Sequence, residues 1–237
     1  FYLSLYIVKI ISYEYIKRFL DTTKSNLFFA KGVILVEGWS EEILMPEIAK
    51  KINYGLTEKE VSIVNVGSKA YLHFAKILLR RKDKEEIEIP VSVVTDLDEK
   101  EYKKEKDKTL KKQINIDYNK SIQKKEKEVL DYENSFVKPF VSKQWTFEWC
   151  LLKSNVLGDS FKEILKTVHS TTFDNCNNDE DWEFGLAKLL LNEGLDKTKL
   201  AYQLSEKIKG LGVLEFSEND TFYYIVDAIK HSCKNGN

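Results

Sequence analysis

The stretch that decides the fold is residues 32–41 (GVILVEGWSE), an apolar run that ends in a glutamate-glycine turn. A second apolar run, residues 90–98 (PVSVVTDLD), ends in two aspartates. Continuous apolar runs of this kind are typical of strands that a parallel sheet buries on both faces. Because open α/β sheets keep their binding crevice at the carboxyl ends of the strands, we expect Glu37, Asp96 and Asp98 to meet there.

The pattern around these runs predicts an α/β fold with a parallel sheet. Strands are predicted over residues 33–36, 61–66 and 91–95, with a helix over 41–52 that Ser40 caps and a second helix after Gly67. Alternating strands and helices at these intervals indicate right-handed crossovers. Residues 136–141 contain Pro139, which favours an edge strand.

Helical spacing dominates the rest of the chain. It precedes the first strand and returns after the edge strand, over residues 12–30, 145–152, 161–168, 181–191, 197–208 and 221–232. We therefore divide the chain into a helical lead-in (1–30), a catalytic core (31–153) and a C-terminal helical region (154–237) that completes the site.

A lysine-rich insertion at about 99–130 interrupts the core. Residues 99–128 contain eleven lysines and seven acids, with few large apolar residues. A solvated helical hairpin or a mobile excursion is the simpler interpretation. The alternative is a basic arm that reaches for a phosphate backbone or contacts a partner subunit.

Net charge, cysteine content and apolar segments limit the binding partners and the cellular compartment that we expect for this chain. The net charge of −1 gives no overall basic character, so any nucleic-acid binding must be local. Three dispersed cysteines without a CxxC pair favour the reducing cytoplasm and argue against zinc. The apolar opening is interrupted by Lys9 and is too short to span a membrane. The start at Phe1, with Met45 as the only methionine, suggests a piece of a longer polypeptide.

Acidic residues at two strand ends predict a metal site. Glu37 ends one strand, Glu41 lies one helical turn further on, and Asp96 and Asp98 point the same way if their strand stays extended. Carboxylates gathered in this way repel one another unless a cation lies between them. Four of them exceed what one Mg²⁺ usually takes from protein, which favours a pair of ions ~3.5–4 Å apart.

Haloacid-dehalogenase-type phosphatases also carry an Asp-x-Asp motif at a strand end. Their pattern places a threonine two residues after the second aspartate, where this chain has Lys100, and it places the motif on the first strand. Both differences count against that interpretation.

An apolar strand ending in Glu-Gly, followed by a strand ending in Asp-x-Asp, resembles the Toprim domain of topoisomerases, primases and certain nucleases. Residues 28–41 closely resemble nucleases of the overcoming-lysogenization-defect (OLD) family, which include the endonuclease subunit of the Gabija anti-phage system. The similarity extends through residues 66–69, 95–98 and 146–148. It implies a Toprim, Rossmann-like parallel sheet flanked by helices, with a helical C-terminal part.

The resemblance also implies roles for individual residues. The expected metal ligands are Glu37, Glu41, Asp96, Asp98 and Glu148. A catalytic lysine is expected at a later helix start, where residues 197–201 (KTKLA) offer Lys197, with Lys199 as the alternative. Its ammonium would stabilise charge that builds on the phosphate. Trp39 lies within the acidic turn, where it is either buried or available to stack on a base.

The leading hypothesis is therefore a DNA endonuclease or nickase domain that uses two Mg²⁺ or Mn²⁺ ions. Family resemblance further implies double-stranded DNA as substrate, a helicase-like partner and a role in anti-phage defence. It also implies an upstream ATPase region through which ATP acts and the protein oligomerises, because this chain contains no Walker-type loop. The rival hypothesis is a non-catalytic Toprim scaffold that binds DNA or a partner protein.

Overall fold

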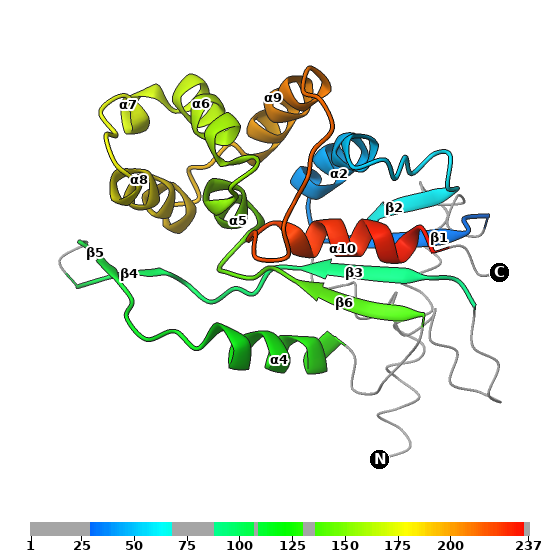
Figure 1. Ribbon diagram of the computed structural model, residues 1–237. Helices are drawn as coiled ribbons and strands as arrows, with labels where there is room; N and C mark the ends of the chain where they lie inside the picture. Colours follow the sequence, from blue (N-terminus) through cyan, green and yellow to red (C-terminus); the bar gives the residue numbers. More distant parts are fainter. Residues whose placement is uncertain (1–28, 68–87, 107–108, 130–135, 235–237) are drawn as a thin grey trace, which may run out of the picture.

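The sheet at the centre of the molecule has four parallel strands. The computed structural model describes residues 29–67, 88–106, 109–129 and 136–234. Within them, β1 (Gly32–Val36), β2 (Val61–Asn65), β3 (Val91–Thr95) and β6 (Val137–Val141) pair in the order β2-β1-β3-β6 (Figure 1). Every residue of the two central strands is buried, which explains their continuous apolar runs. The predicted parallel sheet and its edge strand are confirmed.

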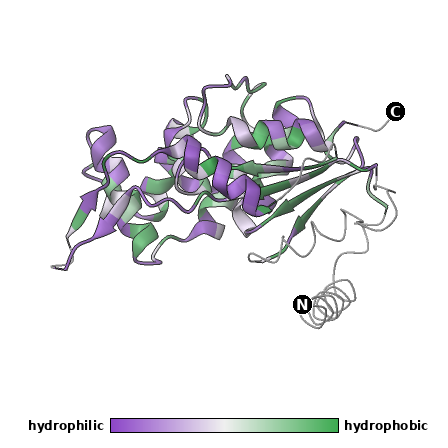
Figure 2. Ribbon diagram, turned by 90° about the horizontal axis from the view of Figure 1, so that it is seen from below, coloured by the Kyte–Doolittle hydropathy of each residue, from purple (hydrophilic) through white to green (hydrophobic). Residues whose placement is uncertain are grey.

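Helices pack around the sheet, and several of them lie together beyond one of its ends (Figure 1). The helices that the structure describes are α2 (Trp39–Lys51), α4 (Tyr118–Val129), α5 (Phe147–Lys153), α6 (Gly158–Val168), α7 (Ser170–Phe173), α8 (Asp179–Leu191), α9 (Lys197–Lys209) and α10 (Tyr223–Ser232). They coincide closely with the predicted helical segments after residue 145. In Figure 2, hydrophobic residues colour most of the sheet, whereas the helices show mixed faces.

The last helix, α10, returns to the sheet and lies against β1, β3 and β6 (Figure 1). Its Ser232 hydroxyl donates to the carbonyl of Val33 at 2.9 Å and lies 2.7 Å from the Ser92 hydroxyl of β3. This close approach requires a glycine at position 32, because a Cβ there would lie 2.0 Å from the Ser232 carbonyl oxygen. The C-terminal end of the described chain is therefore part of the sheet's own packing.

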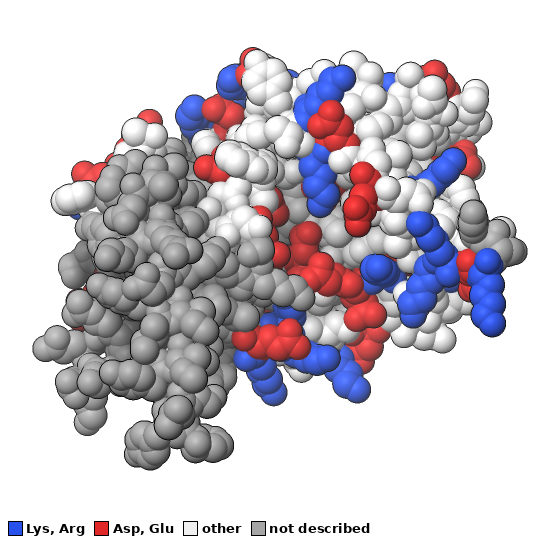
Figure 3. Space-filling view, turned by 180° about the vertical axis from the view of Figure 1, so that it is seen from behind, with Lys and Arg blue, Asp and Glu red and all other residues white. Residues whose placement is uncertain are grey.

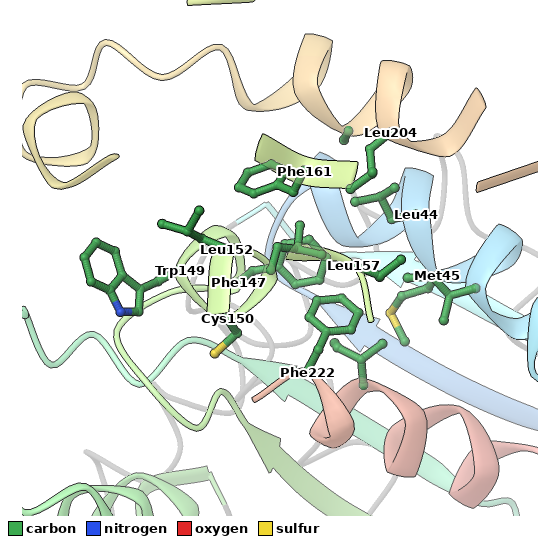
Figure 4. Packing of buried hydrophobic residues seen from close by; sticks show 14 of the residues in the cluster. Leu44, Met45, Phe147, Trp149, Cys150, Leu152, Leu157, Phe161, Leu204 and Phe222 are labelled. Carbon is green, nitrogen blue, oxygen red and sulfur yellow. The ribbon is translucent and has the colours of Figure 1, made fainter. Parts of the chain in front are cut away.

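One hydrophobic core joins the sheet to the C-terminal helices. Met45 of α2, Phe147 of α5, Phe161 of α6, Leu204 of α9 and Phe222 before α10 are all fully buried in it (Figure 4). Shared burial of large side chains makes the packing of each helix depend on the others.

The lysine-rich insertion contains more structure than the sequence suggested. Strands β4 (Tyr102–Lys104) and β5 (Leu110–Lys112) form an antiparallel hairpin, and α4 follows it. The Tyr102 ring packs edge-on against Trp149 at 6.1 Å and against Phe184 at 6.3 Å between ring centroids. The expectation of a helical hairpin is therefore wrong for this part, because a β-hairpin packs there through its aromatic ring on α5 and α8.

Other expectations fall on residues outside the described ranges. They are the helix over most of residues 12–30 and the helix that follows Gly67. No helix in the described part of the chain has the length and apolar character needed to cross a bilayer.

Candidate active site

The carboxyl ends of β1 and β3 place Glu37 and Asp96 on neighbouring strands. The Thr95 hydroxyl, at the last residue of β3, donates to the Glu37 carboxylate. The Phe147 backbone N–H, at the start of α5, donates to Asp96 Oδ1 at 2.7 Å. Both carboxylates are thus oriented by atoms of the adjoining elements.

Glu41 and Glu148 come from the first turns of α2 and α5, and both are buried. The predicted role of Ser40 as N-cap is wrong, because Gly38 occupies that position and no side chain caps the helix. The Ser40 hydroxyl instead donates to Glu148 Oε1 at 3.2 Å. At the start of α5, Thr146 is a true N-cap whose hydroxyl accepts from the Trp149 N–H at 3.2 Å.

Lys197 begins α9, a helix that packs along α2. Its Nζ lies 3.0 Å from Glu148 Oε2, and its side chain remains 48% exposed. The backbone N–H of Lys199 donates to the Asp196 side chain, which caps the helix at 3.1 Å. Between the two candidate lysines, the structure therefore brings the ammonium of Lys197 to the carboxylates.

The carboxylates of Glu37, Glu41, Asp96 and Glu148, named here the acidic cluster, interact electrostatically. Burial, and next the charge of Glu148, raises the pKa of Glu41 from 4.5 to about 7. Burial, and next the charges of Glu41 and Glu148, raises the pKa of Asp96 well above its ordinary value. Lys197 opposes both effects. The cluster therefore favours protons or another cation.

Asp98 does not continue the extended backbone of the strand that leads to Asp96. The strand ends at Thr95, and Asp98 has a φ of +63°, in the left-handed region that aspartate tolerates better than most residues. Its N–H donates to the Trp145 carbonyl at 2.9 Å, and its Oδ2 pairs with Lys125 Nζ of α4 at 3.0 Å. The condition of an extended strand fails, so the two aspartates have different neighbours.

A pocket of about 390 Å³ opens beside these residues. Asp96, Asp98 and Lys197 line it together with leucines from the end of α8 and the loop after it. On the face opposite to that of Figure 1, acidic side chains form a band across the middle of the molecule, with lysine side chains around it (Figure 3). Trp39 is 64% exposed at the start of α2, so the burial alternative for its ring is wrong.

The donor chemistry of the acidic cluster fits a hard divalent cation, because its side-chain donors are carboxylate oxygens. Such an ion would oppose the carboxylate repulsion that, after burial, raises the pKa values of Glu41 and Asp96. Among the described residues, however, no three His, Cys, Asp or Glu side chains are arranged to hold a metal as they stand. Ser40 and Lys197 engage the Glu148 carboxylate, Thr95 engages Glu37, and Lys125 engages Asp98 outside the cluster.

Sequence reasoning missed three contributors to the site. Thr95 immediately precedes the Asp-x-Asp motif, so a local signal for it existed. Ser40 and Lys125 contact acids that lie 108 and 27 residues away in the chain, and no local pattern indicates either contact.

A four-stranded parallel sheet, flanked by helices and with acids at its central strand ends, defines an α/β domain of the Toprim class. Residues 28–98 match the model of the family described as "Overcoming lysogenization defect protein-like, TOPRIM domain". This part of the chain is therefore an OLD-like Toprim domain.

Two solved structures show a similar fold over most of the chain. One is the C-terminal region of the Xanthomonas campestris pv. campestris OLD protein, at 19% identity and a TM-score of 0.53, covering 88% of this chain and 95% of that one. Another is the C-terminal region of the Burkholderia pseudomallei OLD protein, at 18% identity and a TM-score of 0.50, covering 86% and 98%. A search of the curated proteins gave no match.

Proposed function

We propose that this chain is a metal-dependent nuclease domain that cleaves the phosphodiester bonds of DNA. The observation that carries the proposal is the acidic cluster itself, assembled from β1, α2, β3 and α5 beside the ammonium of Lys197. Bringing four carboxylates together, with Glu41 and Glu148 buried, raises the free energy of the folded protein unless a cation compensates. A purely structural region gains nothing from such an arrangement.

The residues that would hold Mg²⁺ or Mn²⁺ are Glu37, Glu41, Asp96, Asp98 and Glu148. When bound, two such ions supply a nucleophile at neutral pH and stabilise the leaving oxygen of a phosphodiester. The chain's own hydrogen bonds from Ser40, Thr95 and Phe147 fix the orientation of the carboxylates beforehand. Preorganised ligands lose less entropy when the site is loaded.

Lys197 is the side chain that we propose to contact the reacting phosphate. Burial lowers its pKa, but the charges of Glu148 and Asp96 outweigh burial and keep that pKa above its ordinary value, so the ammonium stays charged. About half of its side chain is accessible. The ammonium can therefore contact a phosphate oxygen and stabilise the charge that develops there.

Double-stranded DNA is the proposed substrate, and the exposed ring of Trp39 beside the acidic turn is suited to stacking on a base that has left the duplex stack. Resemblance to OLD-family nucleases supports further proposals: a role in anti-phage defence, a helicase-like partner, and oligomerisation and ATP dependence through an ATPase region outside this chain. The nuclease proposal itself does not depend on them.

The test is cleavage of supercoiled plasmid with Mg²⁺ or Mn²⁺, in parallel with EDTA and with the variants Asp96→Ala and Asp98→Ala. Asp159→Asn is the control, because Asp159 is an exposed acid on α6 away from the acidic cluster. Nicking or linearisation that EDTA and both site variants abolish, and that the control retains, is the expected result. No cleavage, alone or within a longer polypeptide, together with retained DNA binding would instead establish the non-catalytic scaffold.

A further inference from the structure

A second lysine reaches the acidic side chains from the lysine-rich insertion. Lys125 lies on α4, and only 7% of the residue is exposed. Lysines are almost never buried to this degree unless their charge is paired. Its Nζ lies 3.0 Å from Oδ2 of Asp98, an acid of the proposed metal site.

Several contacts fix α4 beside the residues that follow β3. The Ser121 hydroxyl donates to Glu99 at 3.3 Å, and the Tyr118 hydroxyl donates to Glu101. The helix also packs on β6, the neighbour of β3. The ammonium of Lys125 is therefore held at Asp98 by the fold of the insertion and not by a chance surface contact.

The two lysines at the site differ in their freedom to move. The Lys197 side chain is 48% exposed, so it can exchange its carboxylate for solvent or for a phosphate. Only 9% of the Lys125 side chain is exposed. Its ammonium is therefore shielded from solvent far more than that of Lys197.

We propose that Lys125 is a built-in cation of the site, which competes with a divalent metal ion for Asp98 and so lowers the affinity of the site for that ion. The proposal rests on the proposed function, because it assigns Asp98 to the metal. Its physical basis is that an ammonium bound to one carboxylate oxygen repels a divalent ion bound to the same carboxylate at short range. The insertion would then set the metal concentration at which the site fills.

The test measures Mn²⁺ binding to the full 237-residue chain by isothermal titration calorimetry. Lys125→Met keeps most of the buried stem and removes the charge, and we expect it to bind Mn²⁺ at least about tenfold more tightly than the unmodified chain. Lys125→Arg keeps the charge and should stay within about threefold of the unmodified chain. Lys124→Met is the matched control, because it removes the same charge from a side chain that is 80% exposed, and it should change affinity less than about twofold.

Circular dichroism and a thermal unfolding curve establish that each variant is folded. If Lys125→Met does not fold, Lys125→Gln provides a neutral side chain that can still donate to Asp98, with the same expected tightening. Unchanged or weaker Mn²⁺ binding in the folded neutral variants would overturn the inference and leave the proposed function intact. Absence of Mn²⁺ binding in every form of the protein, with no plasmid cleavage, would overturn both.

Discussion

Replacing Glu41 by glutamine should stabilise the metal-free protein at neutral and alkaline pH. Glu41 is only 7% exposed, and its charge lies close to the charges of Glu148 and Glu37. Burial raises the pKa of its carboxyl group from 4.5 to about 7, with repulsion by Glu148 as the next contribution. Glutamine has a similar shape and carries no charge, so it removes both the cost of burying a charge and the repulsion by Glu148.

The size and the pH window of the effect follow from this pKa. Below pH 4.5 the carboxyl group is protonated in both the folded and the unfolded chain, so it does not penalise folding. As the pH rises from 4.5 to about 7, the unfolded chain releases the proton first, and the free energy of unfolding falls. At ~1.4 kcal/mol for each pKa unit, the loss above pH 7 is at most about 3.5 kcal/mol.

The assay is urea unfolding of the unmodified chain and Glu41→Gln between pH 4.5 and 8, with EDTA present throughout. The variant should be more stable at pH 8 by up to about 3.5 kcal/mol, and the difference should shrink toward zero at pH 4.5. Glu128→Gln is the control, because its side chain is 55% exposed and should change stability by less than about 0.5 kcal/mol. A Glu41→Gln variant that is less stable at pH 8, or a difference independent of pH, would refute the reasoning.

Three further substitutions test the packing. Gly32→Ala should lower the free energy of unfolding by roughly 3 kcal/mol or more, because the new Cβ would lie 2.0 Å from the Ser232 carbonyl oxygen. Urea unfolding measures this loss, and a loss below about 1 kcal/mol would contradict the close approach. Tyr102→Ala should release the β4–β5 hairpin and speed tryptic cleavage at its lysines, whereas Ile114→Ala, at an 81% exposed side chain, should cleave like the unmodified chain. Phe161→Ala should lower the free energy of unfolding by ~3–5 kcal/mol and shift the midpoint of a single cooperative urea transition to lower urea. Two separate transitions would show that the sheet and the C-terminal helices do not share a core.

The central strands were predictable because burial on both faces leaves a direct trace in the sequence. β1 and β3 are buried at every residue and read as continuous apolar runs. The C-terminal helices were predictable because each buries one stripe at helical spacing. In both cases the information lies within a few neighbouring residues.

The insertion was not predictable, because its structure depends on distant partners. Tyr102 is buried against Trp149 and Phe184, which lie far later in the chain. A stretch with so many lysines contains no local sign that one tyrosine will fix a β-hairpin. Lys125 shows the same limit. It is buried and its neighbour Lys124 is exposed, but nothing in the sequence predicts which of the two lysines is buried.

The site could be predicted in its residue types and only partly in its geometry. Acids at strand ends identified Glu37 and Asp96, but the expectation that Asp98 shares their direction assumed a strand that in fact ends at Thr95. Ser40 looked like a helix cap because serine favours that position. The backbone of Gly38 takes that place instead, and the Ser40 hydroxyl binds Glu148.

The segment that matches the Toprim family contains only part of the proposed site. Residues 28–98 supply Glu37, Glu41 and both aspartates, whereas Glu148 and Lys197 lie on helices beyond it. Those helices are held by the same core as α2, so the position of Lys197 depends on packing between α2 and α9 as much as on the sheet. The C-terminal helices therefore contribute to the proposed chemistry directly, by placing one carboxylate and one ammonium that the strands cannot provide.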